Sequence, residues 1–389
     1  MRSWHGYKIV LFISLMIIGH FSTAACDDAP ILIGATVSME GKYQEPSKMI
    51  QESFRLWAKQ VNQRSGILGR KVKMVLYDDK SQPSLVKHYY QKLIEEDNVD
   101  LVFSPYGTPL TLAASEISER HKFIMLACAA AGKSIWQKGY HYVFGMYAPA
   151  DRMFIGLLDM MAGKGHKTLS LIYDATSSFN LDVVAGALEW ADKFKINIVF
   201  QKGYQNGPLD LPGIVAGLKG TNADGAIVSA YPSDCYELLR ILDENKYKPQ
   251  ILAMTIAPIH PDFEKNAGKV AEHVFGSSQW EPDERIPFPG TKRFISAFNA
   301  STGHMPSYHA GSAYAACQLY EHAIIQTNSL DNQKIRNYIA ALDTVTVIGR
   351  FKVDPTGMQI GHNSIIIQWQ HGKKEIVWPK KMQTAKPIL

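Results

Sequence analysis

The sequence VDLVFSPYGTPLTLAAS, residues 99–115, contains a strand signal, a turn signal and a helix signal in immediate succession. The apolar run Val99–Phe103 predicts a buried strand, and the residues from Leu110 onward predict a helix. Between them, Thr108 is a good helix N-cap and Pro109 suits the first helical position. A helix N-terminus presents free backbone N–H groups, so this turn is a candidate anion site. From these residues alone, a well-capped helix start without a ligand is an equally acceptable interpretation.

Strands and helices alternate along the chain on both sides of this stretch. The alternation begins with ILIGATVS (residues 31–38) and restarts after residue 150 with TLSLIYD (residues 168–174). The chain ends with three predicted helices over 288–342 and short strands over 349–379. This alternation is typical of parallel sheets covered by helices on both faces. We therefore predict an α/β fold with two doubly wound parallel-sheet lobes, between which the chain crosses more than once.

The first 25 residues have the three parts of a secretory signal. Arg2 and Lys8 form a basic start, residues 9–21 (IVLFISLMIIGHF) form an apolar stretch, and small residues follow before Cys26. The apolar stretch is short for a membrane span, and no later segment reaches the required apolar length. We therefore expect an exported protein, soluble or tethered only at its end, from which residues 1–25 are removed.

Cys26, the first residue after the predicted signal segment, leaves lipid attachment open as an alternative. A lipid on Cys26 would tether the protein to a membrane, but lipid-attachment signals usually have Leu three residues earlier, where this chain has Thr23. The chain has four cysteines, which are too few for a disulfide scaffold. Cys128 and Cys317 lie in apolar, alanine-rich segments, which is typical of small buried residues.

Length and charge limit the class of protein further. A chain of 389 residues is long for one core, so two domains are the default expectation. Residues 1–25 hold two basic residues and no acidic one, so the 41 basic and 36 acidic residues become 39 and 36 after their removal. This nearly neutral chain has no basic stripe, and nucleic-acid binding therefore has no support.

The sequence lacks the motifs of common enzymes. The segment ACAAAGKS, residues 127–134, resembles a phosphate-binding loop, but IWQKG after it is too short for the helix that such a loop needs. No nucleophile elbow, zinc-binding helix motif, Cys-x-x-Cys pair or glycine-rich dinucleotide fingerprint occurs. A lone histidine such as His309 is more often structural than a ligand. We therefore expect no catalytic activity, no metal and no cofactor.

Five segments carry a family resemblance through their order and spacing. They are IGATVSMEGKY (33–43), VNQRSGILGRKVKMVLYDDKSQP (61–83), YHYVFGMYAPA (140–150), PSYHAGSAYAACQLYEHAI (306–324) and GRFKVDPTGMQIGHNSIIIQWQHG (349–372). Together they resemble the leucine/isoleucine/valine-binding protein family, the periplasmic ligand-binding subunits of ABC importers. The resemblance covers essentially the whole chain after the signal segment, although no single motif decides it.

The resemblance implies the type I periplasmic binding protein fold. In this fold, three crossing strands join two lobes, which enclose a ligand when they close about the hinge. The implied boundaries place residues 28–146 and 279–346 in lobe I, and residues 147–278 and 347–389 in lobe II.

The resemblance also implies a site for the ligand's carboxylate at two turns of lobe I. The turns match PYGTP and ACAAAG, and they would hold the carboxylate through backbone N–H groups and hydroxyls. They supply Gly107, Thr108, Ala129, Ala130 and Ala131. Relatives that bind amino acids usually have Ser or Thr in the second turn, so the alanines of this chain remove a hydroxyl.

Two further features of the implied cleft concern the rest of the ligand. In leucine-type binders an acidic residue of lobe II pairs with the ligand's ammonium, and this chain has Thr255 at the matching position, which cannot offset a buried ammonium. Five aromatic residues fall at or just beyond strand ends, where the cleft must lie: Tyr43, Tyr106, Phe179, Tyr231 and Trp280. Each could be a core residue on its own, but together they suit an apolar amino acid or an aromatic or branched carboxylate.

We therefore expect a monomeric solute-binding protein that captures a small amino acid or organic acid between its lobes. It would deliver this ligand to the membrane permease of an ABC importer. A ligand-sensing subunit of a signalling receptor is the alternative, and an exported α/β enzyme is the less favoured one.

Overall fold

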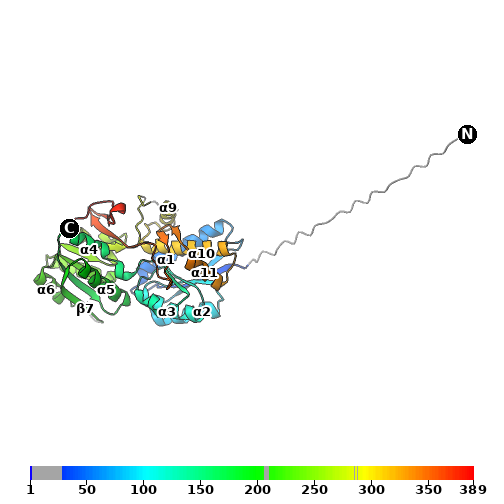
Figure 1. Ribbon diagram of the computed structural model, residues 1–389, viewed down its shortest axis with the longest axis horizontal. Helices are drawn as coiled ribbons and strands as arrows, with labels where there is room; N and C mark the ends of the chain where they lie inside the picture. Colours follow the sequence, from blue (N-terminus) through cyan, green and yellow to red (C-terminus); the bar gives the residue numbers. More distant parts are fainter. Residues whose placement is uncertain (2–28, 206–209, 284, 287) are drawn as a thin grey trace.

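The computed structural model describes Met1 and residues 29–205, 210–283, 285–286 and 288–389. Two α/β lobes lie side by side, one built from the first part of the chain and helices α9–α11, and the other from its middle and its last strands (Figure 1). Cys26 and all but the first residue of the predicted signal segment lie outside the described residues.

The sheet of lobe I is five-stranded and parallel, in the order β2-β1-β3-β4-β5. Its strands are β1 (Ile31–Val37), β2 (Val72–Asp78), β3 (Leu101–Phe103), β4 (Met125–Ala127) and β5 (Val143–Gly145). In the register of the neighbours β3 and β4, Val102 pairs with Met125. Because both strands run in the same direction, the turns that follow them leave the sheet at the same edge.

The helices of lobe I come from two distant parts of the chain. They are α1 (Gln44–Gln63), α2 (Pro83–Glu95), α3 (Thr108–Arg120), α9 (Thr291–Thr302), α10 (Tyr308–Thr327) and α11 (Asn332–Ala341). The hydroxyl of Ser53 on α1 donates a 2.8 Å hydrogen bond to the carbonyl of Ala310 on α10. Tyr320 of α10 donates to the carbonyl of Val102 (2.8 Å) and accepts from the N–H of Leu126 (3.2 Å), which fixes α10 on β3 and β4.

The sheet of lobe II is seven-stranded, in the order β14-β13-β10-β9-β8-β6-β7. Its strands are β6 (Thr168–Asp174), β7 (Asn197–Tyr204), β8 (Gly225–Ser229), β9 (Ile251–Met254), β10 (Phe275–Ser278), β13 (Ile365–Gln370) and β14 (Lys373–Trp378). Its helices are α4 (Ile155–Gly163), α5 (Ser178–Lys193), α6 (Leu211–Thr221), α7 (Pro232–Glu244) and α8 (Phe263–Ala267).

The predicted α/β class with doubly wound lobes is confirmed, with one addition. β13 runs antiparallel to both β10 and β14, so β13 alone opposes the parallel strands, and β14 runs in their direction again. β13 and β14 are joined by His371 and Gly372, which have φ of 52° and 72°. Two positive φ values suit the tight turn of an antiparallel hairpin, which explains the direction of β14.

The chain passes between the lobes after β5, after β10 and after the hairpin of β11 (Thr344–Thr346) and β12 (Gly349–Phe351). The Gln279 side chain connects all three crossing segments. Its Oε1 accepts from the N–H of Ala148 (2.8 Å), and its Nε2 donates to the carbonyl of Ala148 (3.3 Å) and to Ser364 Oγ (3.4 Å). The remaining short 3₁₀ helices are η1 (Lys133–Lys138), η2 (Ala150–Arg152), η3 (Ala257–Ile259), η4 (Gly268–Ala271) and η5 (Lys380–Met382).

Candidate functional site

The turns after β3 and β4 form one structural unit at the edge of the lobe I sheet. The N–H of Gly107 donates to the carbonyl of Ala129 (2.9 Å), and the N–H of Gly132 donates to Thr108 Oγ1 (3.0 Å). Gly107 precedes α3 with φ of 83°, so Gly107 occupies the cap position and Thr108 is the first helical residue. The prediction that Thr108 caps the helix is therefore off by one residue, because glycine adopts positive φ at little cost.

Free backbone donors remain in this unit. Within the part of the chain that the structure describes, no residue accepts a hydrogen bond from the N–H of Ala130 or Ala131. Thr108 lies at a helix N-terminus, whose first N–H groups have no intrahelical partner. The two turns together can therefore bind an anion through backbone N–H groups.

Aromatic residues from both lobes meet next to these turns. Tyr43 of lobe I lies 5.1 Å from Tyr231 of lobe II between ring centroids, and 5.6 Å from Tyr106. Phe179 of lobe II lies 6.4 Å from Tyr231. Burial raises the pKa of the hydroxyls of Tyr43, Tyr106 and Tyr231, so these residues are neutral at physiological pH.

The cavity between the lobes is small, about 20 Å³, which is enough for about one water molecule. It is lined by Tyr106, Gly107, Thr108, Ala129, Ala130, Ala131, Tyr147, Met153, Phe179, Tyr231, Ile256, Gln279 and Tyr308. Ligand sites are usually several hundred Å³, so the lobes in this conformation are closed on their own aromatic side chains.

The structure brings eight predicted site residues together around this cavity, and Tyr43 contacts two of them. Thr255 and Trp280 lie elsewhere. Thr255 Oγ1 donates to the carbonyl of Ala230 (2.7 Å) and accepts from its N–H (3.1 Å), which holds the side chain between β8 and β9. Trp280 packs against Phe294 of α9, with ring centroids 6.0 Å apart. Thr255 and Trp280 therefore support the fold around the cavity and do not line it.

Five lining residues were not among the predicted ones: Tyr147, Met153, Ile256, Gln279 and Tyr308. Tyr147 and Ile256 each follow a strand end closely, so the same rule that found Tyr106 could have found them. Gln279 and Tyr308 flank the segment that crosses back to lobe I, and only the packing of α10 brings Tyr308 to the cavity.

The acidic side chains nearest the predicted loops have partners of their own. Glu45 of lobe I pairs with His260 of lobe II, with Oε1 and Nε2 3.0 Å apart. Asp174 Oδ1 accepts from the N–H (2.8 Å) and the hydroxyl (2.6 Å) of Thr176. Asp234 accepts a 2.6 Å hydrogen bond from the Tyr204 hydroxyl.

His309, at the start of α10, lies next to the aromatic cluster. Its ring centroid is 5.2 Å from that of Tyr106, and Nδ1 is 3.2 Å from Ser307 Oγ. Burial, with a smaller electrostatic contribution from His260 and Lys374, lowers the pKa of His309 to about 3. The buried imidazole is therefore neutral, and its Nε2 has no hydrogen-bond partner among the described residues.

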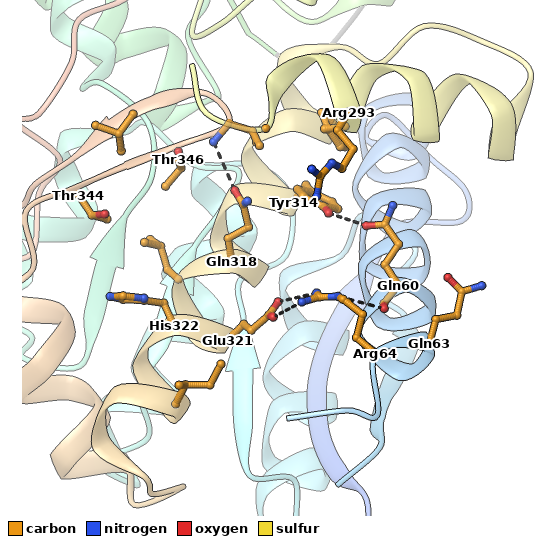
Figure 2. A pocket seen from close by; sticks show the side chains of 16 residues that line it. Gln60, Gln63, Arg64, Arg293, Tyr314, Gln318, Glu321, His322, Thr344 and Thr346 are labelled. Carbon is orange, nitrogen blue, oxygen red and sulfur yellow. Dashed lines mark hydrogen bonds and ion pairs between the residues drawn. The ribbon is translucent and has the colours of Figure 1, made fainter. Parts of the chain in front are cut away.

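A wider groove of about 590 Å³ lies on lobe I between α1, α9, α10 and β11 (Figure 2). Its side chains largely satisfy one another: Arg64 pairs with Glu321 at 3.0 Å, and the Tyr314 hydroxyl donates to Gln60 at 2.5 Å. The groove shares no lining residue with the interlobe cavity, and its features are those of a solvated surface.

Other features of the described residues bear on the sequence analysis. Cys128 and Cys317 are buried free cysteines, as predicted. The segment after β4 forms only the six-residue η1, which agrees with rejecting a phosphate-binding loop. Within the described ranges, no helix combines the length and apolar character needed to cross a membrane, and no acidic, histidine and cysteine side chains cluster as a metal site.

Comparison with known proteins identifies the class of this architecture. The fold resembles LivJ, the branched-chain amino acid transporter substrate-binding protein of Streptococcus pneumoniae in complex with isoleucine. The TM-score is 0.81 at 19% identity, covering 90% of this chain and all of that one. It also resembles a solute-binding protein of an ABC transporter from Rhodopseudomonas palustris BisB5 in complex with 3,4-dihydroxybenzoic acid. Here the TM-score is 0.77 at 21% identity, covering 89% of this chain and 95% of that one. The protein thus has the type I periplasmic binding protein fold.

The sequence comparison gives the family. A Leu/Ile/Val-binding protein homolog 7 of Brucella suis is 22% identical over 384 residues, covering 94% of this chain and 96% of that protein. The family model described as periplasmic binding protein matches residues 30–374. The chain belongs to this periplasmic binding protein family, and the predicted resemblance is confirmed.

Proposed function

We propose that this protein is an extracytoplasmic solute-binding protein without catalytic activity, which captures one small carboxylate-bearing ligand between its two lobes. The observation that carries the proposal is the pair of linked turns beside an interlobe aromatic cavity. The turns offer free N–H groups from Ala130 and Ala131 in a place that closure of the lobes shields from water. A buried carboxylate needs such donors.

The ligand class follows from what the cavity offers. The amide groups and the Thr108 hydroxyl bind the carboxylate, and the aromatic walls contact an apolar body. The two structural relatives described above hold isoleucine and 3,4-dihydroxybenzoic acid, which are both carboxylates with a largely apolar body. The candidates for this chain are therefore apolar or branched amino acids and aromatic or branched acids.

Closure about the crossing segments is part of the proposed function. We place the hinge in the three crossing segments, near residues 146 and 278 and after β12, with Gln279 connecting these segments. The closed, monomeric protein then presents the ligand to the membrane permease of an ABC importer in the periplasm. A ligand-sensing receptor subunit would use the same closure, and uptake assays in a strain lacking the cognate permease distinguish transport from sensing.

A thermal-shift screen of the purified protein against amino acids and aromatic and branched organic acids tests this function. A ligand present at 100 times its Kd adds about 2.7 kcal/mol to the free energy of unfolding, a readily measured shift. Binding of one compound with 1:1 stoichiometry by calorimetry is the expected result. If no carboxylate in a broad panel raises the unfolding temperature, the proposed solute-binding function is wrong.

A further inference from the structure

We propose that the ligand of this cleft is an aromatic monocarboxylate that carries no ammonium group. This inference deepens the solute-binding function proposed above and rests on it. It follows from the charges around the cavity, from their partners and from the arrangement of the aromatic rings.

The cavity has no carboxylate for an ammonium group. Among the described residues that line it, none has an acidic or basic side chain. Lobe II contributes Ile256, Phe179, Tyr231 and Met153 to the lining, so the side from which an acidic partner would come is apolar or phenolic. An ammonium buried against such a wall would lose its hydration without gaining a counter-charge.

Acidic side chains near the cleft cannot easily be recruited. Glu45, Asp174 and Asp234 have the partners described above, and none of them lines the cavity: Glu45 and Asp234 lie in the first turns of α1 and α7, and Asp174 ends β6. Glu281, next to the second crossing, is buried and pairs with the largely buried Lys374 at 2.5 Å. Taking Glu281 from Lys374 would leave a buried cation unpaired, which is strongly unfavourable.

A positive charge already lies over two of the cleft's aromatic rings. The Lys42 ammonium is 5.0 Å from the ring centroid of Tyr43 and 5.2 Å from that of Tyr231. The Lys42 ammonium occupies the electron-rich faces of these two rings, which could otherwise attract a cationic group of the ligand. It also repels a second cation. The rings therefore favour a ligand whose body is uncharged.

The ligand's only charge is then at the linked turns. The N–H groups of Ala130 and Ala131 suit one carboxylate, and the side chains that line the cavity include no cation for a second one. A dicarboxylate would bury an unpaired negative charge, so the cleft selects against it for the same reason that it selects against an ammonium.

The rings favour an aromatic body over an aliphatic one. Tyr43 meets both Tyr106 and Tyr231 edge to face, with interplanar angles of 63° in each pair. When the lobes separate, the contact between Tyr43 and Tyr231 is broken. The edge of one of these two rings and the face of the other then become free. A flat ring that enters between them restores both contacts in the closed, liganded state.

Matched ligand pairs test the inference on the purified protein by calorimetry. 3-Phenylpropanoate and L-phenylalanine differ only in the α-amino group, 4-methylpentanoate and L-leucine form the aliphatic pair, and 3-phenylpropanol lacks the carboxylate. We expect 3-phenylpropanoate to bind at least a hundredfold more tightly than phenylalanine and more tightly than 4-methylpentanoate, with no binding of the alcohol.

The outcomes separate this inference from the function on which it rests. If phenylalanine or leucine binds as tightly as its desamino partner, the inference is overturned while the solute-binding function stands. Tighter binding of 4-methylpentanoate than of 3-phenylpropanoate overturns the aromatic part. If neither these compounds nor the broad carboxylate panel bind, both the inference and the proposed function fail.

A pair of variants at the lobe II wall gives an independent test. Ile256→Glu places a carboxylate in the lining next to the position of Thr255, and Ile256→Gln places a neutral group of the same shape there. After circular dichroism confirms folding, Ile256→Glu should shift the preference toward phenylalanine by at least tenfold relative to Ile256→Gln. The same preference in both variants would mean that the missing carboxylate does not set selectivity.

Discussion

The backbone N–H of Gly132 donates a 3.0 Å hydrogen bond to the side-chain Oγ1 of Thr108, and this bond joins the turn after β4 to the start of α3. A Cβ atom on Gly132 would lie 2.3 Å from Thr108 Cγ2, so the two residues fit only because position 132 is glycine. The Thr108 hydroxyl therefore holds the second turn in place and still has its own proton to donate. One side chain thus shapes the anion site and can contact the anion.

Replacing Thr108 with valine should weaken ligand binding. Thr108→Val keeps the branched shape but removes the hydroxyl that accepts from Gly132 and that we propose contacts the carboxylate. Loss of a hydrogen bond to a charged group should reduce the binding free energy by about 1.5–3 kcal/mol, and the unpaired Gly132 N–H should also lower stability. Calorimetry and thermal unfolding measure the two effects.

The control for this variant is Thr108→Ser, which retains the hydroxyl at the same atom position. We expect it to bind within about 1 kcal/mol of the unaltered protein, since only a methyl group is lost. If Thr108→Val binds the ligand as tightly as Thr108→Ser does, the hydroxyl has no part in recognition and the anion site lies elsewhere.

Ligand binding should compact the protein in solution. The present conformation, with Tyr43 against Tyr231 and a cavity of about 20 Å³, has no room for a ligand of the proposed size, so the lobes must open to admit one. We expect small-angle scattering to show a larger radius of gyration without ligand than at saturation with the best acid from the calorimetric series. Superimposable curves in the two states would contradict hinge closure about the three crossing segments.

The fold and one wall of the cavity can be predicted well from the sequence, because both follow from the order of strands, turns and helices along the chain. Neighbouring parallel strands end at the same edge of a sheet, and so do the turns that follow them. The prediction of β3 and β4 as neighbours was therefore sufficient to bring Thr108 and Ala130 together. The same rule predicted Tyr231 after β8. That these residues bind a ligand stays a prediction.

The other wall depends on features that sequence patterns do not encode. Successive residues after a strand can point to opposite sides, so a shift of one residue separates Thr255, which bonds to Ala230, from Ile256, which lines the cavity. Trp280 and Tyr308 depend on where α9 and α10 dock after the chain returns to lobe I. Such contacts join segments far apart in sequence, and only tertiary packing decides them.

His309 should make the protein less stable in mild acid. Its pKa is about 3 in the folded state, below the usual value near 6.5 of an unfolded chain. Below pH 6.5 the unfolded state therefore binds a proton that the folded state does not, and stability falls as the pH decreases toward 3. At pH 5 this loss is about 2 kcal/mol relative to pH 7.5.

Chemical denaturation of the unaltered protein and of His309→Gln and His309→Asn at pH 7.5 and pH 5 measures this contribution. Both variants remove the titrating group but differ in size, so a common result reflects the proton and not the packing. We expect each variant to lose about 2 kcal/mol less than the unaltered protein between the two pH values. Equal losses in all three proteins would show that His309 does not resist protonation.

The contact between the Glu45 carboxylate and the His260 imidazole should slow the release of the ligand. It joins α1 of lobe I to the residue after η3 of lobe II at 3.0 Å, so it exists only while the lobes are closed. Glu45 is partly exposed, and such a pair contributes about 1 kcal/mol at most. Glu45→Gln should therefore raise the dissociation rate by up to about fivefold, with little change in the association rate.

Glu52→Gln provides the matched control, because it breaks a similar pair that does not cross the cleft. Glu52 lies on the same helix and is 3.2 Å from His304, which follows α9 in lobe I, so opening of the lobes leaves this pair intact. Stopped-flow measurement of ligand release should show faster dissociation for Glu45→Gln and no change for Glu52→Gln, because only the first pair opposes opening. If both variants release the ligand at the same rate, then the contact between Glu45 and His260 does not hold the lobes closed, and the aromatic contacts between Tyr43 and Tyr231 carry that role.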